Sequence, residues 1–415
     1  MKKRLLRFLQ ALGLGALVGI ASGAASAAFL LLLERATHFR EAHQGIVYAL
    51  PLAGLALGFV YERWGVAIRG GNDLIIDTIH EHRVQIPLRM APMVLVGTVL
   101  THLFGGSAGR EGTAIQMGAS LADAIAHRLY LTKQTRRLLL IAGMAGGFGS
   151  VFGTPIAGAL FGLEVLVVGR LEIRALVPAL VASFVGDVVT RRLGVAHTPY
   201  PQLAHVPITF PLLGQLALMG AAMALAAVTF VELTHHLKAF LVRRVPRLPL
   251  RMFIGGCVVV AMWRLVGSSD FLGLGVEGIV GAFRNPSLPW FFFAAKIVFT
   301  AVTLSSGFLG GEVTPLFFVG ATLGAVLARW LGLPIELGAG VGIAAVFGAA
   351  ANAPLALSIM AVELLGWSVM PHVFVVTGLA FLLAGQRGIY GAQRVVRRKL
   401  GGRLGLAKAL RDYRS

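Results

Sequence analysis

Two carboxylates, Glu111 and Glu312, stand at equivalent places in two similar stretches of the chain. Each lies two residues after a glycine and two residues before a threonine, Thr113 or Thr314, where a helix is predicted to begin. The unpaired N–H groups and the positive dipole end of a helix start favour bound anions. A carboxylate there can occupy the anion site and leave it on protonation, which would exchange one proton for one anion. The pair therefore predicts proton-coupled anion transport.

Three further polar residues follow glycine breaks or the last apolar segment. Asn72 offers an amide donor to an anion without adding charge. Asp73 starts a stretch with helical spacing and is either a cap for that helix or a functional acid; we favour the cap. Tyr390 can bring a hydroxyl back to the site, although a tyrosine is commonplace at a membrane interface.

The presence of the remaining acidic residues in apolar stretches needs a separate explanation. Insertion of a charged side chain at the centre of a membrane helix costs about 2.5–3.5 kcal/mol. For each of these residues we expect a structural role, capping or pairing with an arginine, at least as readily as a functional one. They are Asp123, Glu164, Asp187, Glu232 and Glu363.

The composition shows what kind of elements must position these side chains. The chain has 415 residues, of which 57% are hydrophobic and 13% charged, and its mean hydropathy is +0.80. Soluble domains are roughly a quarter charged. The long apolar runs place the chain in a bilayer and exclude a water-soluble globule.

The charge is strongly basic, with 37 Lys and Arg against 18 Asp and Glu and a formal net charge of +19. The basic residues gather at both ends and in short connections, as expected for loops and tails retained in the cytoplasm. We therefore expect a multi-pass protein of the cell (inner) membrane with both termini cytoplasmic, and no nucleic-acid partner. The clusters are Lys2, Lys3, Arg4, Arg7, Arg243, Arg244, Arg394, Arg397, Arg398, Lys399, Arg403 and Lys408.

The N-terminus imitates a signal peptide, because Ala25-Ser26-Ala27 resembles a cleavage site. The apolar run nevertheless continues from Phe8 to Leu33, which is long enough to span a membrane as a tilted helix. We interpret it as a retained first helix, with cleavage as the alternative.

The later apolar segments are numerous, and many are shorter than the roughly 20 residues of a simple crossing. Glycine-rich breaks separate them. Short helices that end inside a membrane occur only where they line a protein cavity, as in transporters and channels with broken helices. The segments are 46–61, 88–105, 113–128, 137–151, 155–169, 174–190, 209–232, 250–267, 289–306, 314–331, 337–350, 354–366 and 370–385.

An internal repeat organises these segments. Pro155 and Glu164 recur as Pro354 and Glu363 at an offset of 199, and the region of Glu111 recurs at 201 to 202. Chance similarity of glycine- and alanine-rich helices is the alternative. The repeat predicts two membrane halves, 1–200 and 205–390, and a short basic cytoplasmic tail, 391–415. If each half crosses the membrane an odd number of times, the halves are inverted and the site lies between them.

At these residues the sequence resembles the CLC chloride channels and proton antiporters. Gly109-Arg110-Glu111-Gly112 is similar to the family's GREG motif, and the glycine-rich turn, the helix 155–164, residues 310–315 and Tyr390 follow in the family's order. The resemblance implies an all-α polytopic membrane protein, a CLC-like inverted repeat of two halves with broken and tilted helices. It also implies a homodimer, with Glu111 as the gating glutamate and Tyr390 as the pore tyrosine.

Three departures resemble the fluoride/proton antiporter branch of that family. Asn72 replaces the turn serine, Thr113 replaces the proline after GREG, and Glu312-Val313-Thr314 supplies an acid and a hydroxyl. Val165 stands where chloride antiporters carry an internal proton glutamate. We expect a fluoride exporter driven by protons, with Glu111 and Glu312 in gating and proton coupling. The residues expected to bind the anion are Asn72, Gly109, Arg110, Gly112, Val313, Thr314 and Tyr390.

Other functions fit less well. A chloride/proton antiporter or a passive anion channel is the main alternative. An intramembrane enzyme is not favoured: His80 and His82 point to opposite sides of a helix, and no HExxH motif is present. The single cysteine, Cys257, excludes a disulfide framework and a thiolate metal site. We expect no cofactor.

Overall fold

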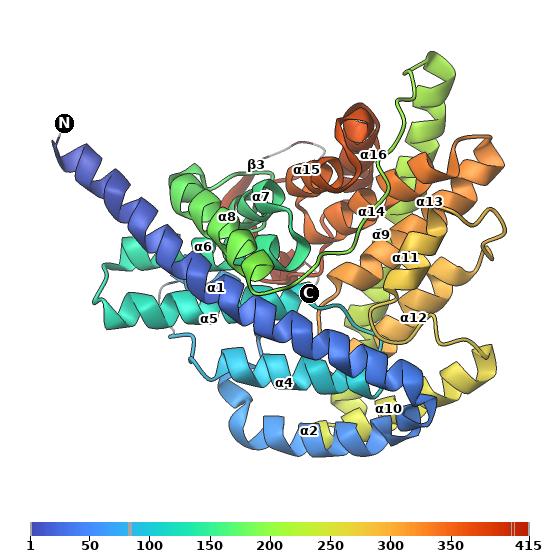
Figure 1. The fold of residues 1–415 in the computed structure, drawn as a ribbon, viewed down its shortest axis with the longest axis horizontal. Helices are drawn as coiled ribbons and strands as arrows, with labels where there is room; N and C mark the ends of the chain where they lie inside the picture. Colours follow the sequence, from blue (N-terminus) through green and yellow to red (C-terminus); the bar gives the residue numbers. More distant parts are fainter. Residues whose placement is uncertain (1, 82–84, 400, 402, 414–415) are drawn as a thin grey trace.

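The computed structural model describes residues 2–81, 85–399, 401 and 403–413, and the described chain is predominantly helical (Figure 1). The helices of the first half are α1 (Lys2–Ala42), α2 (Leu50–Trp64), α3 (Gly71–Glu81), α4 (Met90–Leu103), α5 (Glu111–Arg128), α6 (Lys133–Phe152), α7 (Pro155–Glu164) and α8 (Leu176–Arg192). Those of the second half are α9 (Phe210–Arg244), α10 (Leu248–Val266), α11 (Val276–Ala282), α12 (Phe292–Ser305), α13 (Val313–Leu331), α14 (Ile335–Ala351), α15 (Pro354–Leu365) and α16 (Met370–Leu383).

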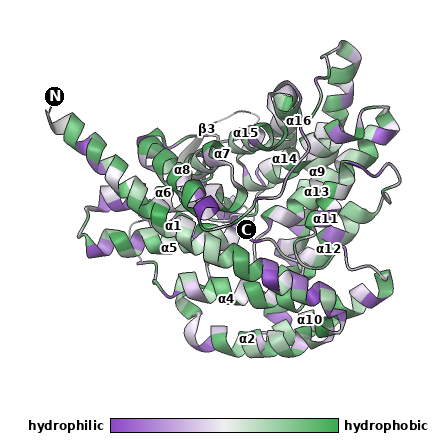
Figure 2. Cartoon of the chain, in the orientation of Figure 1, coloured by the Kyte–Doolittle hydropathy of each residue, from purple (hydrophilic) through white to green (hydrophobic). Residues whose placement is uncertain are grey.

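The predicted apolar segments correspond closely to these helices. Among the described residues, 6 helical spans are long and apolar enough to cross a membrane, and other apolar helices have only 10–17 residues. The segment expected at 8–33 lies within α1, and apolar residues cover most helices along their length (Figure 2). The segment 155–169 ends as a helix at Glu164 and continues into a short strand. The helix α11 was not predicted.

The two halves repeat the same helix order. In each half two helices cross so closely that only glycine fits: a Cβ on Gly118 would lie 2.2 Å from the carbonyl oxygen of Gly143, and one on Gly320 would lie 2.0 Å from that of Gly342. The first pair joins α5 to α6, and the second joins α13 to α14. Equivalent glycines therefore set equivalent helix crossings in the two halves.

Two equivalent short helices, α7 and α15, cap one another. The Glu164 carboxylate accepts the backbone N–H groups of Leu355 and Ala356 at 3.1 and 2.7 Å. Glu363 accepts those of residues 156 and 157 at 3.0 and 2.7 Å. The end of each helix thus contacts the start of the other, so the two run antiparallel. Such reciprocal contacts are characteristic of a twofold relation, which is what an inverted repeat requires.

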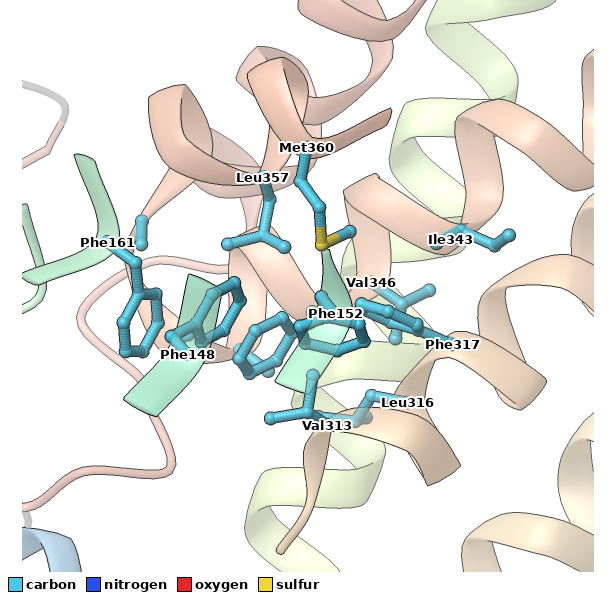
Figure 3. Close-up of a cluster of buried hydrophobic side chains, with 14 of the residues drawn as sticks. Phe148, Phe152, Phe161, Val313, Leu316, Phe317, Ile343, Val346, Leu357 and Met360 are labelled. Carbon is cyan, nitrogen blue, oxygen red and sulfur yellow. The ribbon is translucent and has the colours of Figure 1, made fainter. Parts of the chain in front are cut away.

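An apolar cluster joins the two halves beside these helices (Figure 3). Phe152 of α6 stacks on Phe317 of α13 with ring centroids 5.2 Å apart, and Phe161 of α7 lies 6.1 Å from Phe347 of α14. All four rings are buried. Buried aromatic pairs of this kind combine large apolar area with preferred ring geometry. The cluster fixes the start of α13, at Val313, against the first half.

The basic tail has structure of its own. Strand β2 (Arg394–Arg397) pairs in parallel with β1 (Val167–Val168) and antiparallel with β3 (Arg403–Ala409), so the fold includes one small sheet. The tail also forms ion pairs with α3: Arg411 contacts Asp77 at 2.9 Å and Arg394 contacts Glu81 at 2.8 Å. The domain boundaries expected from the repeat stay a prediction.

Candidate functional site

The two repeats meet at a pair of equivalent glycines. Gly109 and Gly311 form an antiparallel bridge in which each N–H donates to the other's carbonyl oxygen, at 2.6 and 2.7 Å. A Cβ on Gly109 would lie only 2.9 Å from Glu111 Oε2 and 3.0 Å from the Gly311 oxygen. Glycine is therefore required for the close approach of the backbones. Gly109 was expected to bind the anion, and its backbone N–H is engaged in this bridge.

Glu111 lies at the start of α5, and its carboxylate reaches across to the start of α13. Oε1 accepts the Thr314 hydroxyl at 2.6 Å, and Oε2 accepts the backbone N–H groups of Thr314 and Arg110 at 3.2 and 3.1 Å. Arg110 Nε lies 3.5 Å from Glu111 Oε1, and Glu111 is fully buried. A carboxylate thus occupies the set of donors that the sequence assigned to an anion.

The equivalent residues of the second repeat behave differently. Glu312 is the residue before α13, and its Oε2 atom is buried without a hydrogen-bond partner among the described residues. Thr113 bonds the Thr98 hydroxyl at 2.7 Å instead of a carboxylate. The sequence repeat is therefore asymmetric in chemistry: the Glu111 carboxylate fills the anion site, whereas Glu312 keeps one oxygen, Oε2, that meets no donor among the described residues.

A cavity of about 480 Å³ brings most of the remaining candidates together. Its wall includes Asn72, Glu312 and Tyr390, and each of these presents a buried side-chain oxygen that has no partner among the described residues. A Cβ on Gly112 would lie 3.3 Å from Asn72 Nδ2 and 3.8 Å from Glu312 Oε2, so these two side chains approach the same point. Such unpaired polar atoms indicate a place for water or a small ion.

The cavity also contains residues that the sequence did not single out. Thr98 and Gln116 add polar groups to its wall, and Arg69, Lys238 and Arg251 add positive charge. Positive charge along a cleft raises the local concentration of anions. Gln116 lies one helical turn after Gly112 and Thr113, and this spacing could have indicated it. The other four come from elements whose approach only the tertiary structure reveals.

Of the expected anion ligands, Gly112 and Val313 lie at the first turns of α5 and α13. No hydrogen bond joins either backbone N–H to another group within the described ranges. First-turn N–H groups have no partner in their own helix. Both remain candidates for binding an anion once Glu111 has moved.

Apart from Asp73, which lines the cavity, the other acidic candidates lie outside this site. Asp123 is bonded by Arg136 at 3.0 Å and by the Ile86 N–H at 2.7 Å, and Asp187 is paired with Arg191 at 2.9 Å. The carboxylates with structural partners also include Glu164, Glu363 and Glu232, the last paired with Arg387 at 3.1 Å. Asp73 accepts the N–H of Ala392 at 3.0 Å, so its bonded partner lies outside the helix that it was expected to cap.

The histidines show no metal chemistry in the part of the chain that is described. No group of three or more His, Cys, Asp or Glu side chains there could hold a metal ion. His80 contacts the carbonyl oxygen of Leu166 at 3.1 Å, and His82 lies outside the described residues. Cys257 is exposed on α10.

Comparison with known proteins places this geometry in a family. Residues 53–385 match the voltage gated chloride channel family. A "Chloride/fluoride channel protein" from Pseudomonas syringae pv. tomato is 47% identical over 390 residues, covering 92% of this chain and 86% of the relative. The crystal structure of a CLC-type fluoride/proton antiporter superposes with a TM-score of 0.91 at 36% identity, covering 93% of this chain and 98% of that one.

A more distant structure extends the likeness of the fold. A slow cyanobacterial Cl⁻/H⁺ antiporter superposes with a TM-score of 0.80 at 18% identity over 90% of this chain. The expected multi-pass architecture and the CLC fold are thereby confirmed. The chain belongs to the CLC family of membrane channels and transporters, which are not enzymes.

Proposed function

We propose that this protein exports fluoride from the cytoplasm in exchange for protons. The main support is the position of the Glu111 carboxylate. At the junction of the repeats it accepts hydrogen bonds from the Thr314 hydroxyl and from the backbone N–H groups of Thr314 and Arg110. A deprotonated carboxylate competes with a bound anion for these donors. Protonation removes its charge and weakens each charge-assisted hydrogen bond, so the side chain leaves and an anion replaces it.

Glu312 supports the proton half of the exchange. Its Oε2 atom is buried in the wall of the cavity, close to Asn72, and has no partner in the described part of the chain. A buried carboxylate oxygen without a donor is costly unless the group exchanges protons or meets an ion. We assign Glu312 to proton coupling and Asn72, Thr314 and Tyr390 to anion binding, together with the backbone at Arg110, Gly112 and Val313.

Fluoride is favoured over chloride by the donors and by the relatives. Fluoride is a small, strongly hydrated ion that needs compact donors, and the Thr314 hydroxyl and the Asn72 amide are compact. The relatives of 47% and 36% identity are named for fluoride, one as a chloride/fluoride channel and the other as a fluoride/proton antiporter. A chloride/proton antiporter or a passive channel would keep the same fold.

The proposal includes the assembly and its orientation. We infer a homodimer in the cell (inner) membrane with both termini cytoplasmic. Basic residues at both ends support the orientation, because positive segments stay on the cytoplasmic side. Cysteine cross-linking of the protein in membranes tests the dimer, and labelling of single cysteines at each terminus tests the orientation.

Transport from liposomes tests the activity directly. Purified protein is placed in liposomes with equal fluoride and chloride, and both ions and internal pH are followed. We expect fluoride to leave much faster than chloride, with protons moving in the opposite direction. Both fluxes should fall in Glu111→Gln, and proton movement should fall in Glu312→Gln.

A matched control is Glu336→Gln, since Glu336 is an exposed carboxylate in the first turn of α14. It should transport as the unaltered protein does. If the unaltered protein released chloride from the liposomes as fast as fluoride, the fluoride assignment would be contradicted. Fluoride flux without proton movement would identify a passive channel.

A further inference from the structure

The side chain of Asp73 connects two parts of the cavity wall that are 319 residues apart in the sequence. Its Oδ1 atom accepts the backbone N–H of Ala392 at 3.0 Å. Asn72 immediately precedes Asp73, and Tyr390 lies two residues before Ala392. One carboxylate therefore joins the backbone next to each of two proposed anion ligands.

The second oxygen of Asp73 faces the same segment. A Cβ on Gly391 would lie 3.4 Å from Asp73 Oδ2 and 3.3 Å from Cβ of Arg411. The Gly391 carbonyl oxygen accepts the Arg411 N–H at 2.9 Å. Residues 390–392 are thus held between Asp73 on one side and the end of the tail on the other.

The other anchors of this segment fasten it to the core of the two halves. The Ile389 N–H donates to the Ala350 oxygen at 2.9 Å. The Gln393 amide donates to the carbonyl oxygens of Val165 and Ala351, each at 2.8 Å. These bonds fix Tyr390 relative to the halves, but none of them reaches α3, which carries Asn72.

The remaining contacts between α3 and the tail lie farther from the site. Asp77 pairs with both Arg411 and Arg394, and Glu81 pairs with Arg394. Arg411 and Glu81 are each about half exposed, at 49% and 46%, whereas the less exposed Arg394–Asp77 pair is long, at 3.5 Å. Ion pairs that are long or partly exposed are worth little and are screened by salt. The Asp73 bond is the contact that bears on the separation of Asn72 and Tyr390.

We propose that Asp73 is a positioning residue that holds Asn72 and Tyr390 at one fixed separation and so tunes the site for the smaller anion. This inference rests on the proposed function. Binding groups must be held within about 0.5 Å of the productive geometry, which requires locked supporting residues. Without the bond, α3 and the segment 390–392 separate, and the wider site accommodates chloride better relative to fluoride.

Three substitutions separate position from charge. Asp73→Ala removes the bond and the charge, Asp73→Asn keeps an acceptor oxygen without the charge, and Asp73→Glu keeps the charge but displaces it by one methylene. Loss of a charge-assisted bond predicts about a tenfold rise in the fluoride KM for Asp73→Ala, with a lower fluoride/chloride ratio and a smaller change in maximal rate. We expect Asp73→Asn to stay within about threefold of the unaltered protein and Asp73→Glu to resemble Asp73→Ala.

One further measurement and one control variant complete the experiment. Hydrogen–deuterium exchange at residues 388–394 reports the Ala392 bond without any transport, and it should accelerate in Asp73→Ala and Asp73→Glu. Asp77→Asn is the control, because it weakens the tail's ion pairs and leaves the Ala392 contact intact. It should change neither the fluoride KM nor the fluoride/chloride ratio.

Defined outcomes would overturn the inference. Unchanged exchange in Asp73→Ala would show that the bond does not hold the segment. An Asp73→Asn variant as impaired as Asp73→Ala would assign the effect to charge. If Asp73→Ala does not assemble, the contrast between the Asn and Glu variants carries the test. Absence of fluoride transport in the unaltered protein would instead refute the proposed function. The hydrogen–deuterium exchange data would still show whether the Asp73–Ala392 bond holds residues 390–392 in place.

Discussion

Replacing Glu164 by glutamine tests how strongly the two halves hold one another. The Glu164 carboxylate is 6% exposed and accepts the N–H groups of Leu355 and Ala356 at 3.1 and 2.7 Å. Glutamine keeps one acceptor oxygen, so one N–H at the start of α15 loses its partner and faces an NH₂ group. A hydrogen bond to a charged group contributes about 1.5–3 kcal/mol, and an unsatisfied buried donor costs about 1–3 kcal/mol. We therefore expect Glu164→Gln to destabilise the protein by about 2–4 kcal/mol.

The equivalent change in the other half should cost less. Glu363 makes the same pair of bonds, at 3.0 and 2.7 Å, to the start of α7, but it is only partly buried. Water can replace a lost partner there, so Glu363→Gln should cost about 1 kcal/mol. Because both residues secure the same two helices, the double variant should lose less than the sum of the single variants.

Unfolding in detergent micelles, followed by circular dichroism, measures these differences as shifts of the transition. Glu336→Gln is again the control, because it alters an exposed carboxylate at a helix start and should change stability by less than about 1 kcal/mol. Equal shifts for Glu164→Gln and Glu336→Gln would refute the reasoning that reciprocal capping stabilises the junction.

Three other predictions follow from individual contacts. Thr314→Val removes the hydroxyl that donates to Glu111 at 2.6 Å, so fewer protons should move per fluoride in the liposome assay, and Thr314→Ser should restore the ratio. Gly320→Ala should destabilise the protein by at least about 1–3 kcal/mol in the same unfolding experiment, because the added Cβ would lie 2.0 Å from the Gly342 oxygen. The control is Gly214→Ala, which should not destabilise the protein because nothing lies within 4 Å of the added Cβ. Burial lowers the pKa of Lys399 to about 7, so the undocked tail binds more protons between that pH and about 10.4, and docking should strengthen as pH rises through this window. The protection factor of the tail, which is the hydrogen–deuterium exchange rate corrected for base-catalysed intrinsic exchange, should rise accordingly, and Lys399→Met should abolish this dependence.

Much of the site was accessible from the sequence because its residues carry local signals. Glu111 and Glu312 stand beside glycines at helix starts, and equivalent glycine-flanked positions in two halves indicate a shared junction. The structure places Glu111 at that junction with Thr314, and it places Asn72 and Tyr390 on one cavity wall with Glu312. The long apolar segments predicted the membrane helices because the bilayer requires such runs.

Some features could not be read from local patterns. The prediction that Asp73 caps its own helix overlooked a partner 319 residues away. The strand that follows Glu164 depends on pairing with the tail, since Val167 and Val168 form β1 by pairing with β2. An isolated two-residue strand has no local signature, because its hydrogen-bond partners come from elsewhere in the chain.

The sequence by itself determined the membrane location of the chain, its division into two similar halves and the identity of the gating candidate. These follow from hydrophobicity, repetition and the glycines that allow backbones to approach. Only the tertiary structure decided that Glu111 is bonded while one oxygen of Glu312 has no partner within the described ranges, and that the carboxylates of Glu164 and Glu363 cap helices of the opposite half. Glu111 and Glu312 look alike in sequence. Their roles differ because the donors that meet each of them come from helices that are distant along the chain and adjacent in space.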